Sequence, residues 1–365
     1  MTQSTLKHFK DQILEADLSH GTLRITGSGS KDWYGNHLKG TPLSTKSYQG
    51  IVSYQPDELV ITVKSGTSLQ EVETALSEKN QQFAFDPPHF GLATIGGMVC
   101  SGLAGPGRAS VGGLRDFVLG TKIMDGQGQI MDFGGTVMKN VAGYDISRLL
   151  PGSMGTLALL LDVSIKVLPK PAASATLQVE ITQNKAIELI NHLASQPWPI
   201  NASCWIGQEI GTLHLRLSGA KAAVQTAITS FKNEYGMKQL DDDQAKVFWA
   251  SLREQTHVWF NSDPNKPLWR LALPPITSPL NLPGETLLEW HGGQRWWKGE
   301  IASKEIKSIA QSLGGHASIF RAASKTSDML SSLKDNPLTA ALAPIENNLR
   351  KSFDPKGVFA TERLI

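Results

Sequence analysis

Cysteine is scarce in this chain of 365 residues, which contains only Cys100 and Cys204. The two lie far apart in the sequence and form no C-x-x-C pair. This excludes a disulfide scaffold, a structural zinc site and an iron–sulfur cluster held by this chain alone. We therefore expect a reducing, cytoplasmic compartment and no metal site.

A charge excess of one sign and long apolar runs are also missing. Lys and Arg total 35 against 33 for Asp and Glu, so the net charge of +2 gives no polybasic surface and makes nucleic acid a poor candidate partner. The longest apolar run, 157–161, is far shorter than the ~20 residues that span a bilayer. The first residues are polar and lack the apolar core of a secretory signal. We expect a soluble protein with no transmembrane segment.

The commonest nucleotide-binding and hydrolase motifs are absent. Gly35-x-x-x-x-Gly40 is followed by Thr41 where a P-loop requires lysine, so phosphoryl transfer is not supported. Every Gly-x-Gly pair lacks the third glycine of the Rossmann fingerprint. Neither H-E-x-x-H nor G-x-S-x-G occurs, which leaves a zinc protease or an α/β-hydrolase without support.

Glycine and tryptophan are unevenly distributed along the chain. Between Gly91 and Gly155 lie 16 of the 34 glycines, and eight of the nine tryptophans follow Pro197. Between these regions, the proline-bracketed segment 168–172 has the pattern of a linker after a strand. We therefore place a domain boundary in this linker, after residue 171, which agrees with the ~150 residues of a typical domain.

Local patterns predict mixed α and β structure in both parts. In the first part, Asp125-Gly126 between two apolar segments predicts a hairpin. Ser68 and Glu71 form a capping-box pattern at the start of a helix. Strands are predicted at 23–26, 59–63, 156–167, 176–181, 212–217, 269–273 and 286–290. Helices are predicted after Ser68 and at 185–194, 220–234 and 302–313.

The segment Thr26-Gly-Ser-Gly-Ser-Lys31 follows a predicted strand and is the first candidate for ligand binding. A Gly-Ser turn can direct several backbone amides at one anion, which suits a pyrophosphate. Lys31 adds a positive charge, and Ser28 and Ser30 add hydroxyl donors. An ordinary turn is the alternative, and spacing alone favours it.

The glycine-rich stretch from Gly91 to Gly113 is the second candidate. Repeated glycine costs backbone entropy on folding, and close approach to an extended, flat ligand is one reason to retain it. A flexible linker is the alternative. The interspersed Ile95, Val99 and Leu103 favour a buried segment that lines a ligand.

Four motifs in order resemble a known flavoprotein family. They are Gly27-Ser-Gly-Ser-Lys31, Ala93-Thr-Ile-Gly-Gly97, Gly112-Gly-Leu-Arg-Asp-Phe-Val-Leu-Gly120 and Gly152-Ser-Met-Gly-Thr156. This succession resembles the FAD-binding domain of the vanillyl-alcohol oxidase/p-cresol methylhydroxylase (PCMH) flavoproteins. Closer still, 85–90, 138–145, 164–169 and several motifs between 248 and 355 resemble the smaller FAD-binding component of bacterial glycolate oxidases.

The resemblance implies which residues bind FAD. The pyrophosphate loop would comprise Thr26, Gly27, Ser28, Gly29, Ser30 and Lys31. The flavin and ribityl chain would be lined by Thr94, Gly96, Gly97, Ser101, Gly102 and Gly105. The site would be closed by Arg115, Asp116, Gly155 and Val163.

The resemblance also bears on how FAD is held and tuned. Some relatives tether the flavin to a histidine in the pyrophosphate loop, where this chain has Ser and Gly, so we expect non-covalent FAD. A tether at Cys100 is a weaker alternative than a small buried thiol. Lys139, Tyr144 and Asp145 are candidates to stabilise the negative charge of reduced flavin. The equally favoured alternative is that Asp145 caps a helix and pairs with Arg148.

Substrate chemistry has weaker support. Oxidising a 2-hydroxy acid requires a cation for the carboxylate and a base for the hydroxyl proton. No catalytic residue is assigned; the candidates in the second part are Arg270, His291, Arg295, Arg321 and His316, with packing the more frequent role for each. The G-H-x-G-D-G-N and E-H-G motifs of related catalytic subunits are absent. The end of the chain has Ala-Thr-Glu before Arg363 where the family has Asn-Pro-Gly, so no flavin contact is assigned there.

Together these observations predict an α+β fold. A PCMH-type FAD-binding domain with two subdomains would span 1–171, and a smaller α/β cap domain would span 172–350. Residues 351–365 form a tail, for which we hypothesise a return to the FAD domain. Trp296 and Trp297 are candidate anchors of a subunit contact, with core packing as the alternative.

The predicted function is that of an FAD-binding subunit of a multi-subunit glycolate (2-hydroxy-acid) dehydrogenase, which oxidises glycolate to glyoxylate. The resemblance implies two partners, a paralogous FAD-binding catalytic subunit and an iron–sulfur subunit that receives electrons. A peripheral place at the inner membrane through the complex stays open. One alternative is an assembly subunit that binds FAD without turnover, and another is an independent dehydrogenase for a different hydroxy acid.

Overall fold

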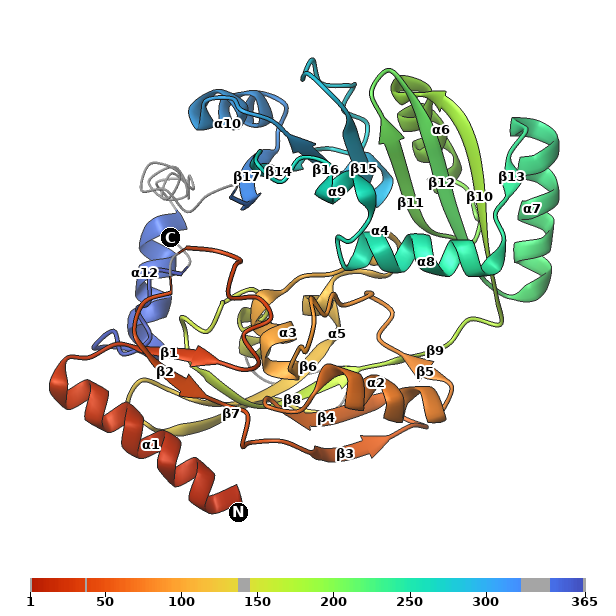
Figure 1. Ribbon diagram of the computed structural model, residues 1–365. Coiled ribbons are helices and arrows are strands. Elements are labelled where there is room, and N and C mark those ends of the chain that lie inside the picture. The colour runs from red at the N-terminus through yellow and green to blue at the C-terminus, as the bar shows by residue number, and fades with distance from the viewer. Residues whose placement is uncertain (1, 37, 137–144, 323–341, 364–365) are drawn as a thin grey trace. The chain divides into compact units, whose positions relative to one another are not determined.

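The computed structural model describes residues 2–36, 38–136, 145–322 and 342–363 (Figure 1). The chain forms two compact units. Unit 1 comprises Met1–Leu103, Gly113–Pro169 and Leu333–Ile365, and unit 2 comprises Ala104–Gly112 and Lys170–Ser332. The chain therefore passes into unit 2 after Pro169 and also makes a short earlier excursion into it at 104–112, which no composition shift signals.

Five strands in the described part of unit 1 form an antiparallel sheet in the order β3-β4-β8-β6-β7. They are β3 (Ile51–Gln55), β4 (Val60–Lys64), β6 (Val118–Met124), β7 (Ile130–Gly134) and β8 (Leu159–Lys166). The hairpin predicted at Asp125-Gly126 is confirmed as the β6–β7 connection. There the Asp125 carboxylate accepts hydrogen bonds from the amides of Gln127 (2.9 Å) and Gln129 (2.7 Å).

Two small sheets and several helices complete the described part of unit 1. Parallel strands β1 (Leu23–Thr26) and β2 (Thr41–Ser44) pair, as do antiparallel β5 (Gln81–Gln82) and β9 (Leu168–Pro169). The helices are α1 (Thr2–Ser19), α2 (Leu69–Glu78), α3 (Ile95–Ser101), α5 (Leu114–Phe117), the 3₁₀ turn η1 (Ile146–Leu149) and α12 (Leu342–Phe353). None of the helices that the structure describes is long and apolar enough to cross a membrane.

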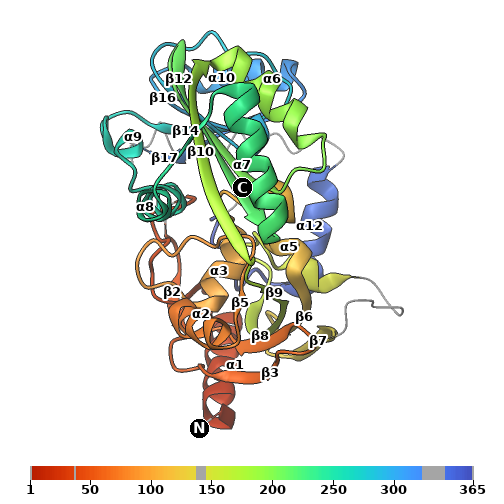
Figure 2. The same cartoon turned by 90° about the vertical axis from the view of Figure 1, so that its right-hand side faces the viewer.

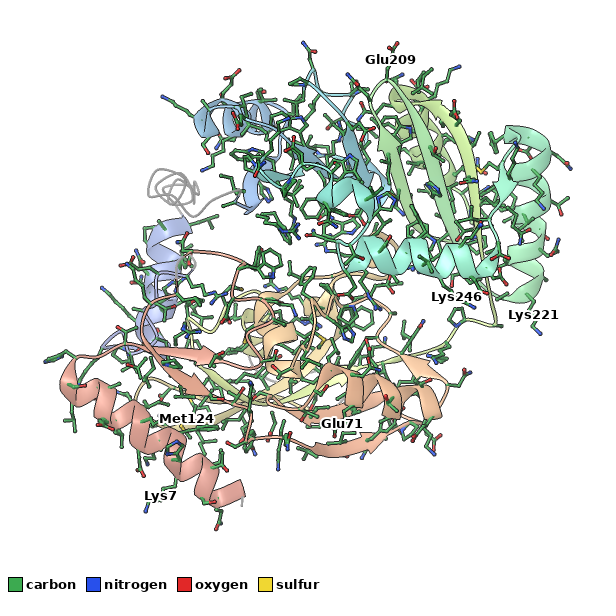
Figure 3. The ribbon with its side chains drawn as sticks, viewed as in Figure 1. Lys7, Glu71, Met124, Glu209, Lys221 and Lys246 are labelled. Atoms are coloured by element: carbon green, nitrogen blue, oxygen red, sulfur yellow. The ribbon has the colours of Figure 1, made fainter. Side chains whose placement is uncertain are left out.

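Helix α1 contributes one apolar face to the core of unit 1. Phe9 and Ile13 are buried together with Met124 of β6 and with Val358 and Phe359 from the end of the chain. Lys7 projects from the opposite, exposed face of α1 (Figure 3). The Leu23 amide also donates to the Val358 carbonyl (2.7 Å). The last described residues are thus an integral part of this core.

The capping box predicted at Ser68 and Glu71 is wrong, although the helix itself is confirmed as α2. Ser68 occupies the N-cap position, but its side chain makes no capping hydrogen bond. The Leu69 amide instead donates to the Ala93 carbonyl (2.9 Å). A neighbouring segment of chain therefore satisfies one of the free donors of the first helical turn.

Eight strands in the described part of unit 2 form one antiparallel sheet in the order β13-β10-β12-β11-β15-β16-β14-β17. The strands are β10 (Ala173–Thr182), β11 (Ile200–Gly207), β12 (Ile210–Gly219), β13 (Lys238–Gln239), β14 (Leu268–Ala272), β15 (Thr286–Glu289), β16 (Gln294–Lys298) and β17 (His316–Arg321). The helices are α4 (Arg108–Val111), α6 (Gln183–Ala194), α7 (Lys221–Tyr235), α8 (Asp242–Arg253), α9 (Val258–Asn261), η2 (Trp290–Gly292) and α10 (Ser303–Ser312).

Helices cover both faces of this sheet. On one face, α6 and α7 bury Ile190 and Phe231 against Trp205 and Leu215, and α10 packs on Trp269. On the other face, the indole of Trp249 in α8 donates to Thr176 (2.9 Å). Figure 2 shows α7 and α8 on opposite sides of β10. The mixed α and β composition predicted from the sequence is confirmed.

Trp296 and Trp297 are core residues and not exposed anchors. They are 4% and 1% exposed, and because they are adjacent in β16 they point to opposite faces of the sheet. Each indole donates to a partner inside the unit, Trp296 to Glu289 (2.6 Å) and Trp297 to the Pro283 carbonyl (2.8 Å). The core-packing alternative is therefore correct for both.

Candidate cofactor site

Unit 1 contains a cavity with about 660 Å³ of empty space, its solvent-open part included. Eleven residues of the predicted FAD set line it: Thr26, Gly27, Ser28, Gly29, Ser30, Lys31, Thr94, Gly96, Gly97, Ser101 and Gly155. The sequence did not single out eight further lining residues as FAD contacts: Ile25, Asp32, Thr45, Ser65, Cys100, Met154, Leu160 and Arg363.

The loop after β1 presents free backbone donors beside this cavity. The Thr26 carbonyl accepts from the Thr45 amide (2.9 Å), which fixes the start of the loop on β2. Gly29 has φ +81°, and its carbonyl accepts from the Asp32 amide (3.0 Å) to close a turn. Among the described residues, the amides of residues 27–30 find no acceptor. Such a group of unpaired amides is a suitable binding site for a phosphate group.

Glycine is required at position 27 because two protein segments meet there. A Cβ at Gly27 would lie 2.2 Å from the Oγ1 of Thr94, and a Cβ at Gly96 would lie 2.8 Å from the Cβ of Ser65. The sequence predicted close approach of a ligand for the glycines of 91–113, Gly96 among them, and an anion-binding turn for Gly27. Contact between the loop, α3 and the end of β4 is the physical reason at both positions.

The first turn of α3 is occupied by protein contacts. The amides of Ile95 and Gly96 donate to the carbonyls of Thr67 (2.9 Å) and Ser65 (2.7 Å). The Gly97 amide donates to the capping hydroxyl of Thr94 (3.2 Å). The amides that are available to bind an anion in this cavity therefore belong to the loop and not to this helix.

Basic side chains lie on and beside the loop. Lys31 and Arg363 are each 7% exposed. The Lys31 amine donates to the His89 carbonyl (3.2 Å), and burial lowers the pKa of Arg363. A carboxylate oxygen of Asp32 lies 3.8 Å from Arg363, and its other oxygen lies 3.6 Å from Arg24. Two guanidinium groups therefore share one carboxylate beside the cavity, which suits an anionic ligand.

The hydroxyl of Ser65 is a second sign that the cavity accommodates a polar ligand. Ser65 is 1% exposed, and within the described parts of the chain its hydroxyl has no hydrogen-bond partner. An unsatisfied buried hydroxyl is unfavourable by about 1–3 kcal/mol. A ligand with oxygen or nitrogen atoms would satisfy it, and FAD offers such atoms along its ribityl chain and diphosphate. The residues present therefore fit this cofactor.

Five residues of the predicted FAD set do not line the cavity. Gly102 is the left-handed C-cap of α3, Val163 is fully buried in β8, and Asp116 accepts from the Gly113 amide (2.8 Å). Arg115 lies beside Asp116 on α5. Gly105 lies in unit 2, where its carbonyl accepts from the indole of Trp290 (3.1 Å).

The predicted redox group falls partly outside the described structure. Lys139 and Tyr144 lie in the segment 137–144, which is outside the described residues. Asp145 is described: its carboxylate lies 2.9 Å from Arg148 and accepts from the Ser147 hydroxyl (2.9 Å). Asp145 precedes η1, but its side chain makes no capping hydrogen bond. Of the alternative role predicted for Asp145, the pairing with Arg148 is therefore present and the helix cap is absent.

In unit 2, the structure separates candidates that the sequence could not rank. Arg295 is 3% exposed and donates to three backbone carbonyls, those of Thr277, Ser278 (2.8 Å) and Gly292 (3.2 Å). Burial lowers the pKa of Arg295 to about 10. Arg321 donates to Gln255 (2.7 Å). Both guanidinium groups are committed to holding protein segments.

His291 is likewise engaged. Its Nδ1 lies 3.1 Å from the Ser203 hydroxyl and its Nε2 lies 3.4 Å from the Ser110 hydroxyl. Burial lowers its pKa. His291 and the preceding Trp290 both have positive φ, 58° and 52°, an uncommon conformation for side chains of this size.

Arg270 is the candidate with a guanidinium not committed to other groups. It forms no hydrogen bond or ion pair with any other described residue, and its guanidinium lies 5.4 Å from the centre of the Trp290 ring. Arg108 lies 4.4 Å from the same ring. Burial and the charge of Arg270 lower the pKa of His316. Two cations that share one indole form a suitable site for a carboxylate.

This difference between the arginines predicts different effects of removing them. Arg295→Ala is expected to destabilise unit 2 by about 3 kcal/mol, because it leaves buried carbonyls without donors. Arg270→Ala is expected to change stability by no more than about 0.5 kcal/mol. Urea unfolding followed by tryptophan fluorescence measures both. Equal losses for the two variants would contradict the assignment of Arg295 to structure.

Comparison with known proteins agrees with the cavity. Residues 7–134 match the family model of an FAD binding domain. Glycolate oxidase subunit GlcE of Escherichia coli (strain K12) is 40% identical over 355 residues, which cover 97% of this chain and 95% of that protein. Glycolate oxidase subunit GlcD of Bacillus subtilis (strain 168) is 33% identical over 138 residues, 38% of this chain and 29% of that protein.

A solved structure supports the fold at greater distance. Alkyldihydroxyacetonephosphate synthase matches with a TM-score of 0.63 at 12% sequence identity, over 96% of this chain and 74% of that one. Fold, cavity and family model together define an FAD-binding flavoprotein with a PCMH-type domain, an FAD-dependent oxidoreductase. More narrowly, the chain belongs to the family of glycolate oxidase subunit GlcE. The predicted fold class, family and FAD cofactor are confirmed.

Proposed function

We propose that this chain is the FAD-binding subunit of a glycolate (2-hydroxy-acid) dehydrogenase, with the FAD diphosphate at residues 27–31. The observation that carries the proposal is the row of unpaired loop amides beside a cavity where Arg24 and Arg363 share the single carboxylate of Asp32. Similarity to subunit GlcE along nearly the whole chain supports the substrate class. When bound, FAD supplies the electron acceptor for oxidation of an alcohol carbon.

Each group of the cavity has a distinct role in this proposal. The amides of 27–30 and the charge of Lys31 hold the diphosphate, and the Ser65 hydroxyl contacts the polar chain between the phosphates and the flavin ring. Thr94 does not contact the cofactor through its cap; it fixes α3 against the loop.

Non-covalent attachment of FAD is part of the proposal. The loop carries Ser28 and Ser30 and no histidine. Cys100 lines the cavity, but burial raises the pKa of its thiol to about 11, so the nucleophilic thiolate is scarce at neutral pH. Acid precipitation of the holoprotein is expected to release all flavin into the supernatant. Flavin that stays with the pellet would contradict this.

For substrate, we assign the carboxylate to Arg270 and the hydroxyl proton to His316. Neither side chain forms a hydrogen bond with another described residue, and the lowered pKa of His316 favours the neutral imidazole that a base requires. A second candidate function is an FAD-binding assembly subunit without turnover. The commitment of Arg295, Arg321 and His291 to protein contacts favours it.

The partners are proposed from family similarity and cysteine count. A paralogous FAD subunit similar to GlcD would carry the missing catalytic motifs, and an iron–sulfur subunit would take electrons onward. This chain has two cysteines, one in each unit, too few to hold a Cys₄ cluster alone. Within this proposal the complex is cytoplasmic, with a peripheral site at the inner membrane.

An anaerobic absorption spectrum of the purified chain, before and after glycolate, tests the proposal. Flavin bands that bleach show that this chain oxidises substrate itself, and Arg270→Ala should then raise KM more than it lowers kcat. Flavin bands that persist assign oxidation to a partner and support the assembly alternative. No flavin bands after reconstitution with FAD would overturn the cofactor site.

A further inference from the structure

Arg363 connects the end of the described chain to the cofactor loop. One of its terminal nitrogens donates to the carbonyls of Lys31 (2.7 Å) and Tyr34 (2.9 Å), residues more than 300 positions earlier in the sequence. The Arg363 carbonyl accepts from the Asn36 amide (3.3 Å). A Cβ at Gly35 would lie 3.0 Å from that carbonyl, so the two segments are in close contact.

The guanidinium of Arg363 retains an unsatisfied donor. The residue is 7% exposed, lines the cavity, and its Nε has no hydrogen-bond partner among the described residues. A buried charged donor without an acceptor is strongly unfavourable. Phosphate oxygens are well suited to satisfy it, because a hydrogen bond from a guanidinium to an anionic oxygen is stronger than one between neutral groups.

The local charge balance also leaves Arg363 without full compensation. The nearest approach of its side chain to a carboxylate is 3.8 Å, to Asp32, and Asp32 also faces Arg24 at 3.6 Å. One carboxylate is therefore shared by two guanidinium groups, with the Lys31 amine on the same loop. A dianionic diphosphate would neutralise the excess.

From these observations we infer that Arg363 binds the FAD diphosphate directly and that FAD thereby locks the segment 354–363 onto the cofactor loop. The inference depends on the proposed position of the diphosphate at residues 27–31. The segment is already anchored by the Asp354 carboxylate, which accepts from the amides of Val358 (2.8 Å) and Phe359. FAD would add the last attachment, at Arg363, so that cofactor affinity and docking of this segment are linked.

Titration of apoprotein with FAD, followed by flavin fluorescence, tests the direct contact. Arg363→Ala is expected to weaken FAD binding about 30-fold and to leave riboflavin binding unchanged, because riboflavin has no phosphate. Arg363→Lys is expected to recover part of the loss, since it restores the charge but not the Nε donor. Lys356→Ala, in the same segment, is the matched control; its amine pairs with Asp17 on the surface (2.8 Å), so FAD affinity should not change.

The same titration on Lys31→Ala separates failure of this inference from failure of the proposed site. If Lys31→Ala weakens FAD binding and Arg363→Ala does not, the inference for Arg363 is wrong and the loop site stands. If neither weakens it, the proposed position of the diphosphate is wrong. A melting temperature of each apoprotein identifies a variant that simply unfolds, and in that case Arg363→Lys decides the question.

Limited proteolysis provides a readout independent of affinity. Trypsin cleavage after the exposed Lys356 is expected to be at least 10-fold slower in wild type with saturating FAD than without it. Arg363→Ala should lose this protection even when FAD is saturating. Equal protection from trypsin by FAD in wild type and Arg363→Ala would show that Arg363 does not link FAD binding to docking of the segment 354–363.

Discussion

Gly27→Ala is expected to lower FAD affinity about 100-fold and to destabilise unit 1. The added methyl would lie 2.2 Å from the Oγ1 of Thr94 and 3.2 Å from its Cβ and Cγ2. Overpacking of this kind costs about 1–3 kcal/mol, and loss of the Thr94 cap on α3 costs about 1 kcal/mol more. A change of 1.4 kcal/mol is a tenfold change in binding affinity. If these costs displace the loop amides from the positions that bind the diphosphate, they account for the expected 100-fold loss of FAD affinity.

The measurement is FAD titration of the apoprotein together with its melting temperature. Gly135→Ala is the matched control: it lies in the same unit, and apart from its chain neighbours no atom of the described residues comes within 4 Å of the Cβ position. In a Thr94→Ala background the penalty of Gly27→Ala should shrink, because the closest clashing atom is gone. If Gly27→Ala lowers FAD affinity equally in that background, the loss of affinity has a cause other than contact with Thr94.

The second large effect is a loss of stability as the pH falls from 6.5 to 4. His214 is buried against the ring of Phe248, with centroids 4.1 Å apart. Burial, and secondarily the nearby His257, lowers the pKa of His214 to about 4. In the unfolded chain the imidazole titrates near 6.5, so between these values the unfolded state binds the extra proton and is favoured.

The size of the pH effect follows from the two pKa values. A difference of about 2.5 pH units at 1.36 kcal/mol per unit predicts a loss of about 3 kcal/mol, complete below pH 4 and absent above pH 7. His214→Phe keeps an aromatic ring beside Phe248 and removes the titratable imidazole. The free energy of unfolding, measured in urea, should therefore depend less on pH between 6.5 and 4. His192→Gln, at an exposed position on α6 of the same unit, should retain the wild-type slope. A His214→Phe slope equal to wild type would refute the assignment.

Local patterns predicted what depends on neighbours in sequence. The β-branched segment 59–63 forms β4, and the loop 26–31 lines the cavity, because each is specified by residues within one short stretch. The strand β11 and the helix α8 were not predicted, although Asp241 caps α8 by accepting from the amides of Asp243 and Gln244. The buried Ala245, Trp249 and Leu252 give α8 a helical spacing that could have been recognised, whereas β11 lacks a regular alternation and tertiary packing decides its conformation.

Long-range contacts explain the rest of the site. Ser65 reaches the cavity because β4 pairs with β8 and ends there, and Arg363 reaches it because the chain returns after α12. Neither path is visible in the local sequence. Arg270 and Arg295 occur in similar apolar surroundings in the sequence, and only the positions of the Thr277, Ser278 and Gly292 carbonyls distinguish the committed arginine from the uncommitted one.

The short excursion 104–112 has a consequence for modularity. It supplies unit 2 with α4, whose Ser110 hydroxyl donates to the Ile200 carbonyl (2.9 Å), and with the Gly105 carbonyl that accepts from Trp290. A genetic cut near residue 170 would therefore separate unit 2 from a part of itself. Inheritance of unit 2 by gene fusion or recombination requires two coordinated exchanges, so the two units are expected to be transmitted together as a single evolutionary entity.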